Sequence, residues 1–94
     1  MRYEFEWDRE KNAANLRNHD VSFDEARTVF ADPLAMLMAD PDHSVHEQRF
    51  VVLGLSRKQR LLVVAFAERS QRTRLISARP AAARERRQYE EDPK

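Results

Sequence analysis

Hydrophobic residues gather in four short runs in the middle of the chain and toward its end. The runs are LAMLMA, RFVVLGLS, RLLVVAFAE and TRLISAR. Their lengths are typical of strands, and the second and third are apolar on both faces, so we expect those two centrally in a sheet. The polar segments SRKQR and ERSQR between them predict hairpin loops, which make neighbouring strands antiparallel.

The region before these runs has a different pattern. The segment YEFEW alternates aromatic and acidic residues, as in a short edge strand. Asp8 is placed to cap a helix over DREKNAANLRNH. Ser22, with Glu25 three residues later, forms a capping-box pattern that begins a second helix, and Pro33 ends that segment. We therefore predict two N-terminal helices.

The chain ends in a segment typical of a third helix. Pro80 is expected to open it, at a helix position where the missing N–H of proline costs least. The element order β-α-α-β-β-β-β-α predicts an α+β fold with an antiparallel sheet of about four strands and the helices on one face. Gly54, inside a strand, indicates a bulge or a close approach of another backbone. We expect residues 1–94 to form a single domain.

Composition narrows the class of protein. Cysteine is absent, which removes disulfides and thiolate chemistry. No run is long enough to span a membrane and the first residues lack the apolar block of a signal peptide, so we expect a cytoplasmic protein with no membrane partner.

The charge is distributed unevenly along the chain. Residues 1–48 hold five basic and eleven acidic side chains, a net of −6, whereas residues 49–94 hold twelve basic and five acidic, a net of +7. Ten of those twelve basic residues are arginine. Because a guanidinium binds phosphate in a bidentate way, this bias favours an anionic ligand, with solvated strand edges and helix faces as the alternative.

Several side chains are able to move protons. Lys11, Asn15 and His19 form a polar stripe at i, i+4 and i+8 of the first helix, which is either a phosphate-binding face or an exposed helix surface. Glu68 is a further proton carrier at the end of a strand. Tyr89 is either another proton carrier or a core tyrosine that packs the last helix against the sheet.

The arginines of the second half lie near strand ends and on the last helix. Arg72 and Arg74 share a face of an extended strand, whereas Arg79 falls on the opposite parity, unless its place before Pro80 changes this. Arg86 and Tyr89 lie three residues apart, on one side of the last helix.

A cluster of oxygen and nitrogen ligands occurs at DPDHSVHE, with Asp40, Asp42, His43, His46 and Glu47. It matches no metal-binding spacing, so a solvated loop is favoured and no metal or cofactor is expected. Arginines with lysine, histidine, glutamate and tyrosine suit metal-independent RNA cleavage: a base takes the 2′-OH proton, arginines stabilise the phosphorane and an acid protonates the leaving oxygen. DNA, which lacks the 2′-OH, would be bound and not cut.

Motifs along most of the chain resemble those of one family. The motifs are FEWD with a lysine three residues on, VSFDEA, VF-x-DP, and ISAR followed by ERR-x-Y. Together they resemble the BrnT family, from about position 4 to 90. Two positions depart from its usual pattern: Asp20 follows His19 where the family has glycine, and Gln59 precedes Arg60 where it again has glycine.

The resemblance implies a fold, an activity and partners. It implies a RelE-like toxin fold and a metal-independent endoribonuclease that inhibits translation and growth. A BrnA-type ribbon-helix-helix antitoxin would neutralise it, and the complex would bind operator DNA. By position, the expected catalytic residues are Lys11, His19, Glu68, Arg79 and Tyr89, and the expected RNA-binding residues are Arg69, Arg74 and Arg86. The alternative is a non-catalytic module that binds nucleic acid or the antitoxin.

Overall fold

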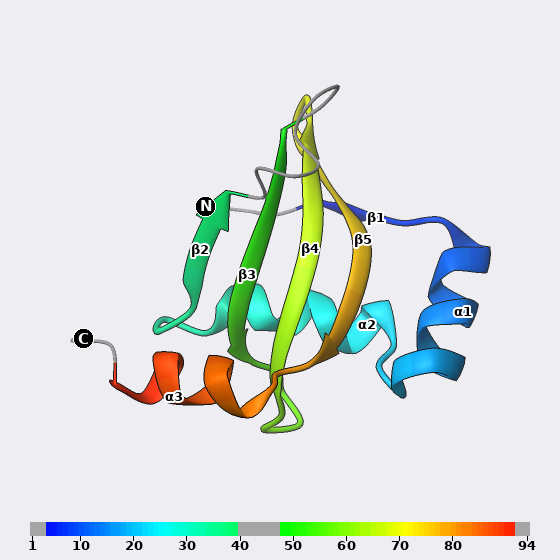
Figure 1. The fold of residues 1–94 in the computed structure, drawn as a ribbon. Helices are drawn as coiled ribbons and strands as arrows, with labels where there is room; N and C mark the ends of the chain where they lie inside the picture. The colour runs from blue at the N-terminus through cyan, green and yellow to red at the C-terminus, as the bar shows by residue number, and fades with distance from the viewer. Residues whose placement is uncertain (1–3, 40–47, 92–94) are drawn as a thin grey trace.

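The computed structural model describes residues 4–39 and 48–91, which form one α+β unit around a five-stranded sheet (Figure 1). The strand order is β1-β5-β4-β3-β2. The elements are β1 (Phe5–Glu6), α1 (Arg9–His19), α2 (Phe23–Ala26), the 3-10 helix η1 (Arg27–Ala31), β2 (Met36–Ala39), β3 (Arg49–Leu55), β4 (Leu61–Arg69), β5 (Arg72–Pro80) and α3 (Ala83–Glu91).

The sheet differs from the predicted one at its β1 edge. Strands β2 to β5 are antiparallel neighbours, as the short loops require, and β3 and β4 lie in the interior of the sheet. Strand β1 adds a fifth strand, which is parallel to β5 through the pairs Phe5–Thr73 and Glu6–Arg74. The sequence pattern identified an edge strand, but no short loop joins it to β5, so local rules gave neither its partner nor its direction.

The N-terminal helices begin at the expected caps. The carboxylate of Asp8 accepts a hydrogen bond from the Lys11 N–H at 3.0 Å, and the Ser22 hydroxyl accepts one from the Glu25 N–H at 3.1 Å. Only half of the predicted capping box forms, because the Glu25 carboxylate is bound by Arg60 and Ser56 instead of its own helix. After Ala26 the second helix tightens into η1.

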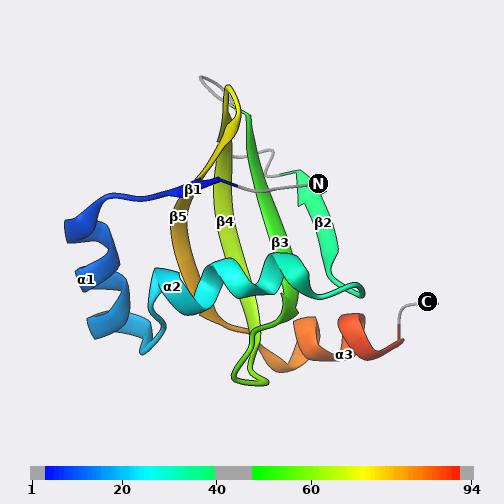
Figure 2. The ribbon, with the colours of Figure 1, turned by 180° about the vertical axis from the view of Figure 1, so that it is seen from behind.

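Helices lie on both faces of the sheet, which corrects the expectation of a single covered face. Figures 1 and 2 show α2 behind the sheet in one view and in front of it in the other. On that side the main core packs sheet residues such as Leu62 and Phe66 against Phe23 and Val29. On the opposite face, Tyr89 of α3 packs against Leu53 and Leu61.

The last helix begins later than predicted. Pro80 is the final residue of β5, paired with Leu62, and Ala81 N–H still donates to the Leu61 carbonyl at 2.9 Å. Helix α3 therefore starts at Ala83. Pro80 is tolerated in the strand because the missing N–H falls at the end of the ladder, where proline is least costly.

Gly54 marks a close approach and not a bulge. It pairs regularly with Leu62, but a Cβ at this position would lie 3.0 Å from Ala35 Cβ and from Val29 Cγ1. Those contacts are tighter than ordinary van der Waals distances, so the absence of a side chain lets η1 lie directly on β3.

Candidate nucleic-acid interface

A β-bulge in β5 brings its arginines onto one face of the sheet. The pairing of β5 with β4 skips Ile76, so the strand gains one residue relative to its partner. One extra residue reverses the alternation of side chains, and Ser77 and Arg79 therefore face the same side as Arg74. The expectation that Arg79 has the opposite parity is wrong because it counted residues along an unbroken strand.

The face that carries these arginines is the one opposite α2 and η1, and we call it the open face. Arg49, Ala67 and Arg74 form one row across β3, β4 and β5, and Arg69 pairs with Arg72 in the next row. Arg79 lies toward the other end of β5. The bulge leaves four rungs of the β4–β5 ladder between them, which puts Arg79 roughly 13 Å from Arg74 along the sheet. Their guanidinium groups also bind different carboxylates, so we expect them to contact different phosphates.

Two of these arginines are bound to a carboxylate at the β1 edge. Glu6 lies 3.2 Å from Arg74 Nη1 and 3.5 Å from Arg72 Nη1, through its two different oxygens. The side chains of Arg74 and Glu6 are each about one quarter exposed, whereas Arg72 is well exposed. These contacts orient the guanidinium groups, while solvent still reaches them.

Arg79 forms the best-defined ion pair on the open face. Its Nη1 and Nη2 donate to the two oxygens of Glu85 at 2.8 and 2.7 Å, and Nη1 also reaches the Pro80 carbonyl at 3.3 Å. The Glu85 carboxylate accepts a further hydrogen bond from the Ala82 N–H at 2.8 Å. The guanidinium, followed by this backbone donor, lowers the pKa of Glu85 to about 2, although burial opposes the shift.

Tyr89 has the position of a packing residue. It is buried, and its hydroxyl donates to Asp32 Oδ2 at 2.6 Å. The same oxygen accepts the Leu55 N–H at 2.8 Å, so Asp32 joins α3 to the end of β3. Burial and the neighbouring carboxylate raise the pKa of Tyr89 to about 12, which keeps the hydroxyl protonated at neutral pH.

The stripe on α1 is divided between structure and surface. The buried side chain of Asn15 donates to the Ala78 carbonyl at 2.8 Å and accepts the Ala78 N–H at 3.0 Å, in the manner of a neighbouring strand. Lys11 and His19, one turn to either side of Asn15, are exposed. Asn15 therefore fixes α1 beside the residue that precedes Arg79.

Three other expected site residues, Glu68, Arg69 and Arg86, lie on different parts of the surface. Glu68 is exposed at the end of β4, but it pairs with the buried Thr73 and has the parity of the α2 side of the sheet. Arg69 is exposed on the open face. Arg86 is exposed on α3, and its Nη1 lies 3.9 Å from Glu90 Oε2. Tyr89 is buried, so Arg86 and Tyr89 share a side of the helix only approximately.

The sequence reasoning did not select Glu85, Glu6 or Arg49. A signal for Glu85 was present, because a glutamate in the first turn of a helix that follows a strand-end arginine can reach both the backbone and the arginine. Glu6 gave no local signal, since β1 joins the sheet through a long-range pairing. The place of Arg49 in the row depends on the register between β3 and β4.

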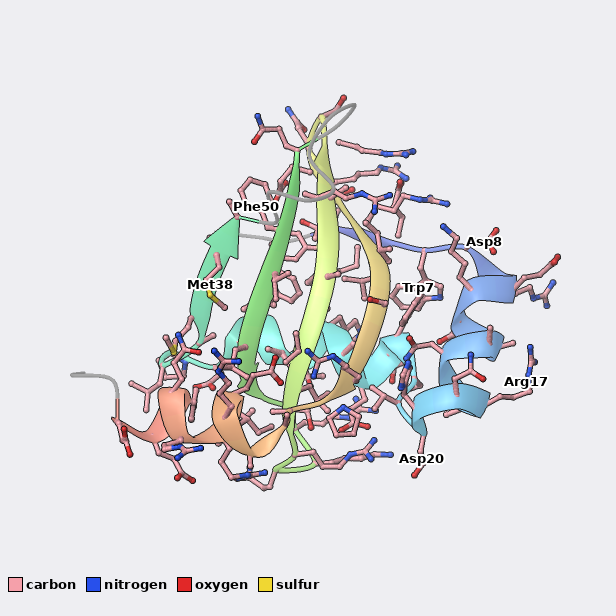
Figure 3. All side chains as sticks on the ribbon, in the orientation of Figure 1. Trp7, Asp8, Arg17, Asp20, Met38 and Phe50 are labelled. Atoms are coloured by element: carbon pink, nitrogen blue, oxygen red, sulfur yellow. The ribbon has the colours of Figure 1, made fainter. Side chains whose placement is uncertain are left out.

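Trp7 is a packing residue in the structure. It lies between β5 and α1 and makes an edge-on contact with Phe23 at 6.0 Å between ring centroids, whereas Arg17 points outward from α1 (Figure 3).

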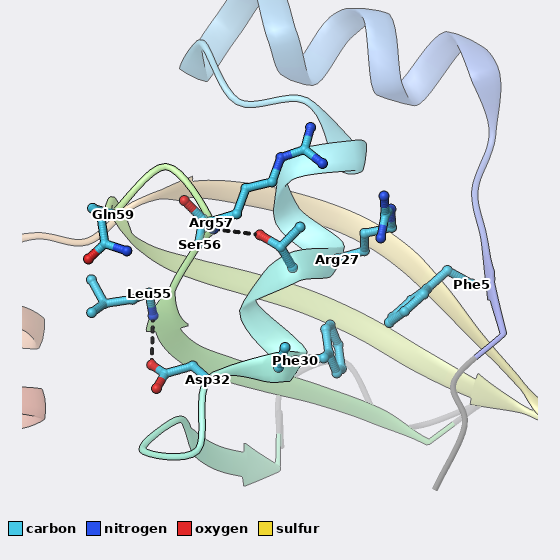
Figure 4. Close-up of a pocket in the computed structure, with 10 residues that line it drawn as sticks. Phe5, Arg27, Phe30, Asp32, Leu55, Ser56, Arg57 and Gln59 are labelled. Atoms are coloured by element: carbon cyan, nitrogen blue, oxygen red, sulfur yellow. Dashed lines mark hydrogen bonds between the residues drawn. The ribbon is translucent and has the colours of Figure 1, made fainter.

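A separate hollow of about 850 Å³ lies on the α2 side, between η1 and the β3–β4 hairpin (Figure 4). Polar groups that line it are already hydrogen-bonded: the Arg57 N–H donates to Thr28 Oγ1 at 2.9 Å, and Arg57 Nη2 donates to Asp24, outside the hollow, at 2.8 Å. None of the expected catalytic or RNA-binding residues lines it.

The described residues provide neither a cluster of metal ligands nor a membrane-spanning helix. Within residues 4–39 and 48–91, no three histidine or acidic side chains cluster as metal ligands would. The cluster considered at Asp40–Glu47 lies outside the described residues. No described helix has the length and apolar character needed to cross a bilayer.

The fold and the open face together define a small α+β domain with a row of arginines across one sheet face. A profile of the family described as "Ribonuclease toxin, BrnT, of type II toxin-antitoxin system" matches residues 7–85. The chain belongs to the BrnT family of type II toxin–antitoxin systems. The family is named for a ribonuclease toxin.

A solved structure has the same fold. The 1.1 Å crystal structure of the Brucella abortus ribonuclease toxin BrnT aligns with a TM-score of 0.64 and 18% identity, over 86% of this chain and 99% of that chain. At this identity the match supports the fold alone. No curated protein sequence matches the chain.

Proposed function

We propose that the protein is a metal-independent endoribonuclease toxin that binds single-stranded RNA across the open face. The observation that carries the proposal is the bulge at Ile76, which gathers Arg72, Arg74 and Arg79 on one side of β5. The arginines lie at separate positions along β5 and are held by different carboxylates, Glu6 and Glu85, so the face suits a strand with several phosphates. This expectation agrees with the class of toxin to which the family belongs.

The proposed chemistry divides the work between Arg79 and α1. Arg79 stabilises charge that develops on the phosphorane, because its guanidinium is fixed and about two fifths exposed. Lys11 or His19 is the base that removes the 2′-OH proton, since Asn15 holds their helix against β5 beside Arg79. Arg69, Arg74 and Arg86 bind the phosphates that flank the scissile bond.

Two of the expected catalytic residues, Glu68 and Tyr89, have no main catalytic role in the mechanism that we propose. Glu68 has the parity of the opposite sheet face, so it would act as the base only if RNA passed over the β4–β5 hairpin. Tyr89 donates a hydrogen bond to Asp32, and we assign it the role of anchoring α3 in place of that of general acid. This leaves Lys11 or His19 to return a proton to the leaving oxygen.

The partners follow from the family. We propose a BrnA-type ribbon-helix-helix antitoxin as the neutralising partner, with operator DNA bound through the toxin–antitoxin complex. We further propose that the fold is RelE-like and that cleavage in the cytoplasm inhibits translation and growth. The support is membership in a toxin–antitoxin family and the basic open face.

The test is cleavage of RNA by purified protein in excess EDTA. We expect cleavage with 2′,3′-cyclic phosphate ends, a loss of about 100- to 1,000-fold in Arg79→Ala and a smaller loss in His19→Ala. Arg57→Ala is the matched control, because Arg57 is an exposed, ion-paired arginine on the other side of the sheet. If wild-type protein binds RNA in a salt-dependent way but cuts none, the chain is a non-catalytic binding module.

A further inference from the structure

The Arg79–Glu85 pair uses only part of the guanidinium. The carboxylate meets the end of the group, through one N–H of Nη1 and one N–H of Nη2. The second N–H of Nη1 points to the Pro80 carbonyl. The Nε–H and the outer N–H of Nη2 remain, and these two donors lie parallel on the adjacent edge of the group.

That remaining edge has the geometry of a phosphate-binding fork. Within the described part of the chain, no group accepts a hydrogen bond from Nε or from the outer N–H of Nη2. Two parallel N–H donors on one edge of a guanidinium bind two oxygens of a phosphate. The carboxylate therefore occupies the end of Arg79 and leaves its side edge available to a ligand.

Glu85 is itself fixed from two directions. The backbone N–H of Ala82 donates to the same oxygen that accepts from Arg79 Nη1. Helix α3, which carries Glu85, is held in turn by the hydrogen bond from Tyr89 to Asp32. The orientation of the guanidinium thus depends on the docking of α3 at the end of the open face.

We propose that Glu85 is a positioning residue that turns the unused edge of Arg79 toward the scissile phosphate, an assignment that rests on the proposed nuclease function. Two other roles fit the contacts less well. A carboxylate that blocked the phosphate would occupy the side edge, but this one occupies the end. A general base needs a pKa near neutrality, whereas Glu85 has a pKa of about 2.

The experiment is a double-mutant cycle of Glu85→Ala and Arg79→Ala, with RNA cleavage measured in EDTA. We expect Glu85→Ala to lower kcat by about 10- to 100-fold with little change in KM, because the catalytic group is misdirected while the flanking arginines remain. The double variant should be no slower than Arg79→Ala alone, since a positioning residue has no effect without the group it positions. Glu85→Gln, which keeps one acceptor oxygen, should lie between wild type and Glu85→Ala.

A matched control comes from the other side of the sheet. Asp24 binds Arg57 at 2.8 Å and Arg27 at 3.0 Å, and all three side chains are exposed. Asp24→Ala removes an acidic partner of arginines but should leave kcat and KM as in wild type. Unfolding curves of every variant identify any loss of activity that comes from loss of folded protein.

Three kinetic results would overturn the proposal. They are an unchanged or higher kcat in Glu85→Ala, losses in the double variant that equal the product of the single losses, and an acid limb of the pH–rate profile that disappears in Glu85→Gln. The last result would make Glu85 the base.

A second measurement separates this proposal from the nuclease assignment. A DNA strand of the substrate sequence, which cannot be cut, is titrated while the NMR signal of Arg79 Nε–H is followed. We expect the signal to shift in wild type and to shift much less in Glu85→Ala. If wild type cuts no RNA, the nuclease function fails, and equal shifts in the two proteins would refute the positioning role independently.

Discussion

Two arginine–glutamate pairs on opposite sides of the sheet have the same chemistry and different surroundings. On the α2 side, Glu25 is 1% exposed and Arg60 is one third exposed. On the open face, Glu85 is 27% and Arg79 is 43% exposed. The first pair joins the start of α2 to the β3–β4 hairpin, whereas the second lies at the junction of β5 and α3.

The two pairs also differ in how many hydrogen bonds they complete. Arg60 donates hydrogen bonds from Nε and Nη2 to Glu25, and a further one from Nη2 to the Asp20 carbonyl. The Ser56 hydroxyl also donates to the Glu25 carboxylate. Arg79 keeps one edge unused. Removing one partner of a saturated, buried pair destabilises the fold, whereas an exposed pair with remaining donors can bind a ligand. Number of contacts alone would have ranked Arg60 above Arg79 as a functional residue.

The largest expected effect is on the free energy of unfolding, which should fall more when the buried pair is broken than when the exposed pair is broken. Arg60→Ala leaves the buried Glu25 carboxylate without its main partner and should lower the free energy of unfolding by about 3 kcal/mol. Arg79→Ala should lower it by less than about 1 kcal/mol, because that pair is exposed. Urea unfolding followed by tryptophan fluorescence measures both values. Equal losses in the two variants would mean that the pairs have equivalent roles.

A second substitution tests whether Tyr89 has a structural role, like the Arg60–Glu25 pair, or a catalytic role, like Arg79. Tyr89→Phe removes the hydrogen bond to Asp32 and should destabilise the protein by about 1–2 kcal/mol. Cleavage per folded molecule should change little if Tyr89 only anchors α3. A loss of 100-fold or more with little loss of stability would restore Tyr89 as a catalytic acid.

Acid unfolding sharpens the comparison further. The pKa of Glu85 is lowered from 4.5 to about 2, so its stabilising contribution is present above about pH 4.5 and is lost as the pH falls toward 2. Glu85→Gln should therefore lose less stability than wild type between pH 5 and about 2. Some acid sensitivity should remain, because Arg60 and Ser56 also lower the pKa of Glu25. Parallel curves for wild type and Glu85→Gln would show that the pair does not form.

The smallest expected effect concerns the hairpin that carries Arg60. Gln59 has a φ of 64°, a left-handed conformation that costs any residue with a Cβ. Gln59→Gly should stabilise the protein by about 0.5–1 kcal/mol and leave RNA cleavage unchanged. Thermal unfolding and a cleavage assay provide the two measurements. A change in cleavage would link this hairpin to the site.

Local sequence rules predicted the elements well and their long-range relations poorly. The caps at Asp8 and Ser22 and the four main strands were confirmed because each depends on neighbours in the chain. The glycine departures at Asp20 and Gln59 coincide with left-handed backbone, which agrees with the preference for glycine in that conformation.

The bulge at Ile76 was not predictable in the same way. It depends on the register between β4 and β5, and it decides which face Arg79 occupies. The role of Asn15 was likewise outside the reach of local patterns, because its partner, Ala78, lies 63 residues away. The arginines of β5 could be selected from sequence as candidates, whereas their placement on one face required the pairing of distant segments.

Binding of RNA to the open face is tested most directly by amide chemical shifts. A 2′-deoxy strand of the substrate sequence is titrated into labelled protein, so that binding occurs without cleavage. We predict shifts concentrated in β5 from Arg72 to Arg79, in the facing residues of β3 and β4, and at the start of α3. Shifts concentrated instead in α2, η1 and the hairpin around Arg57 would contradict the account.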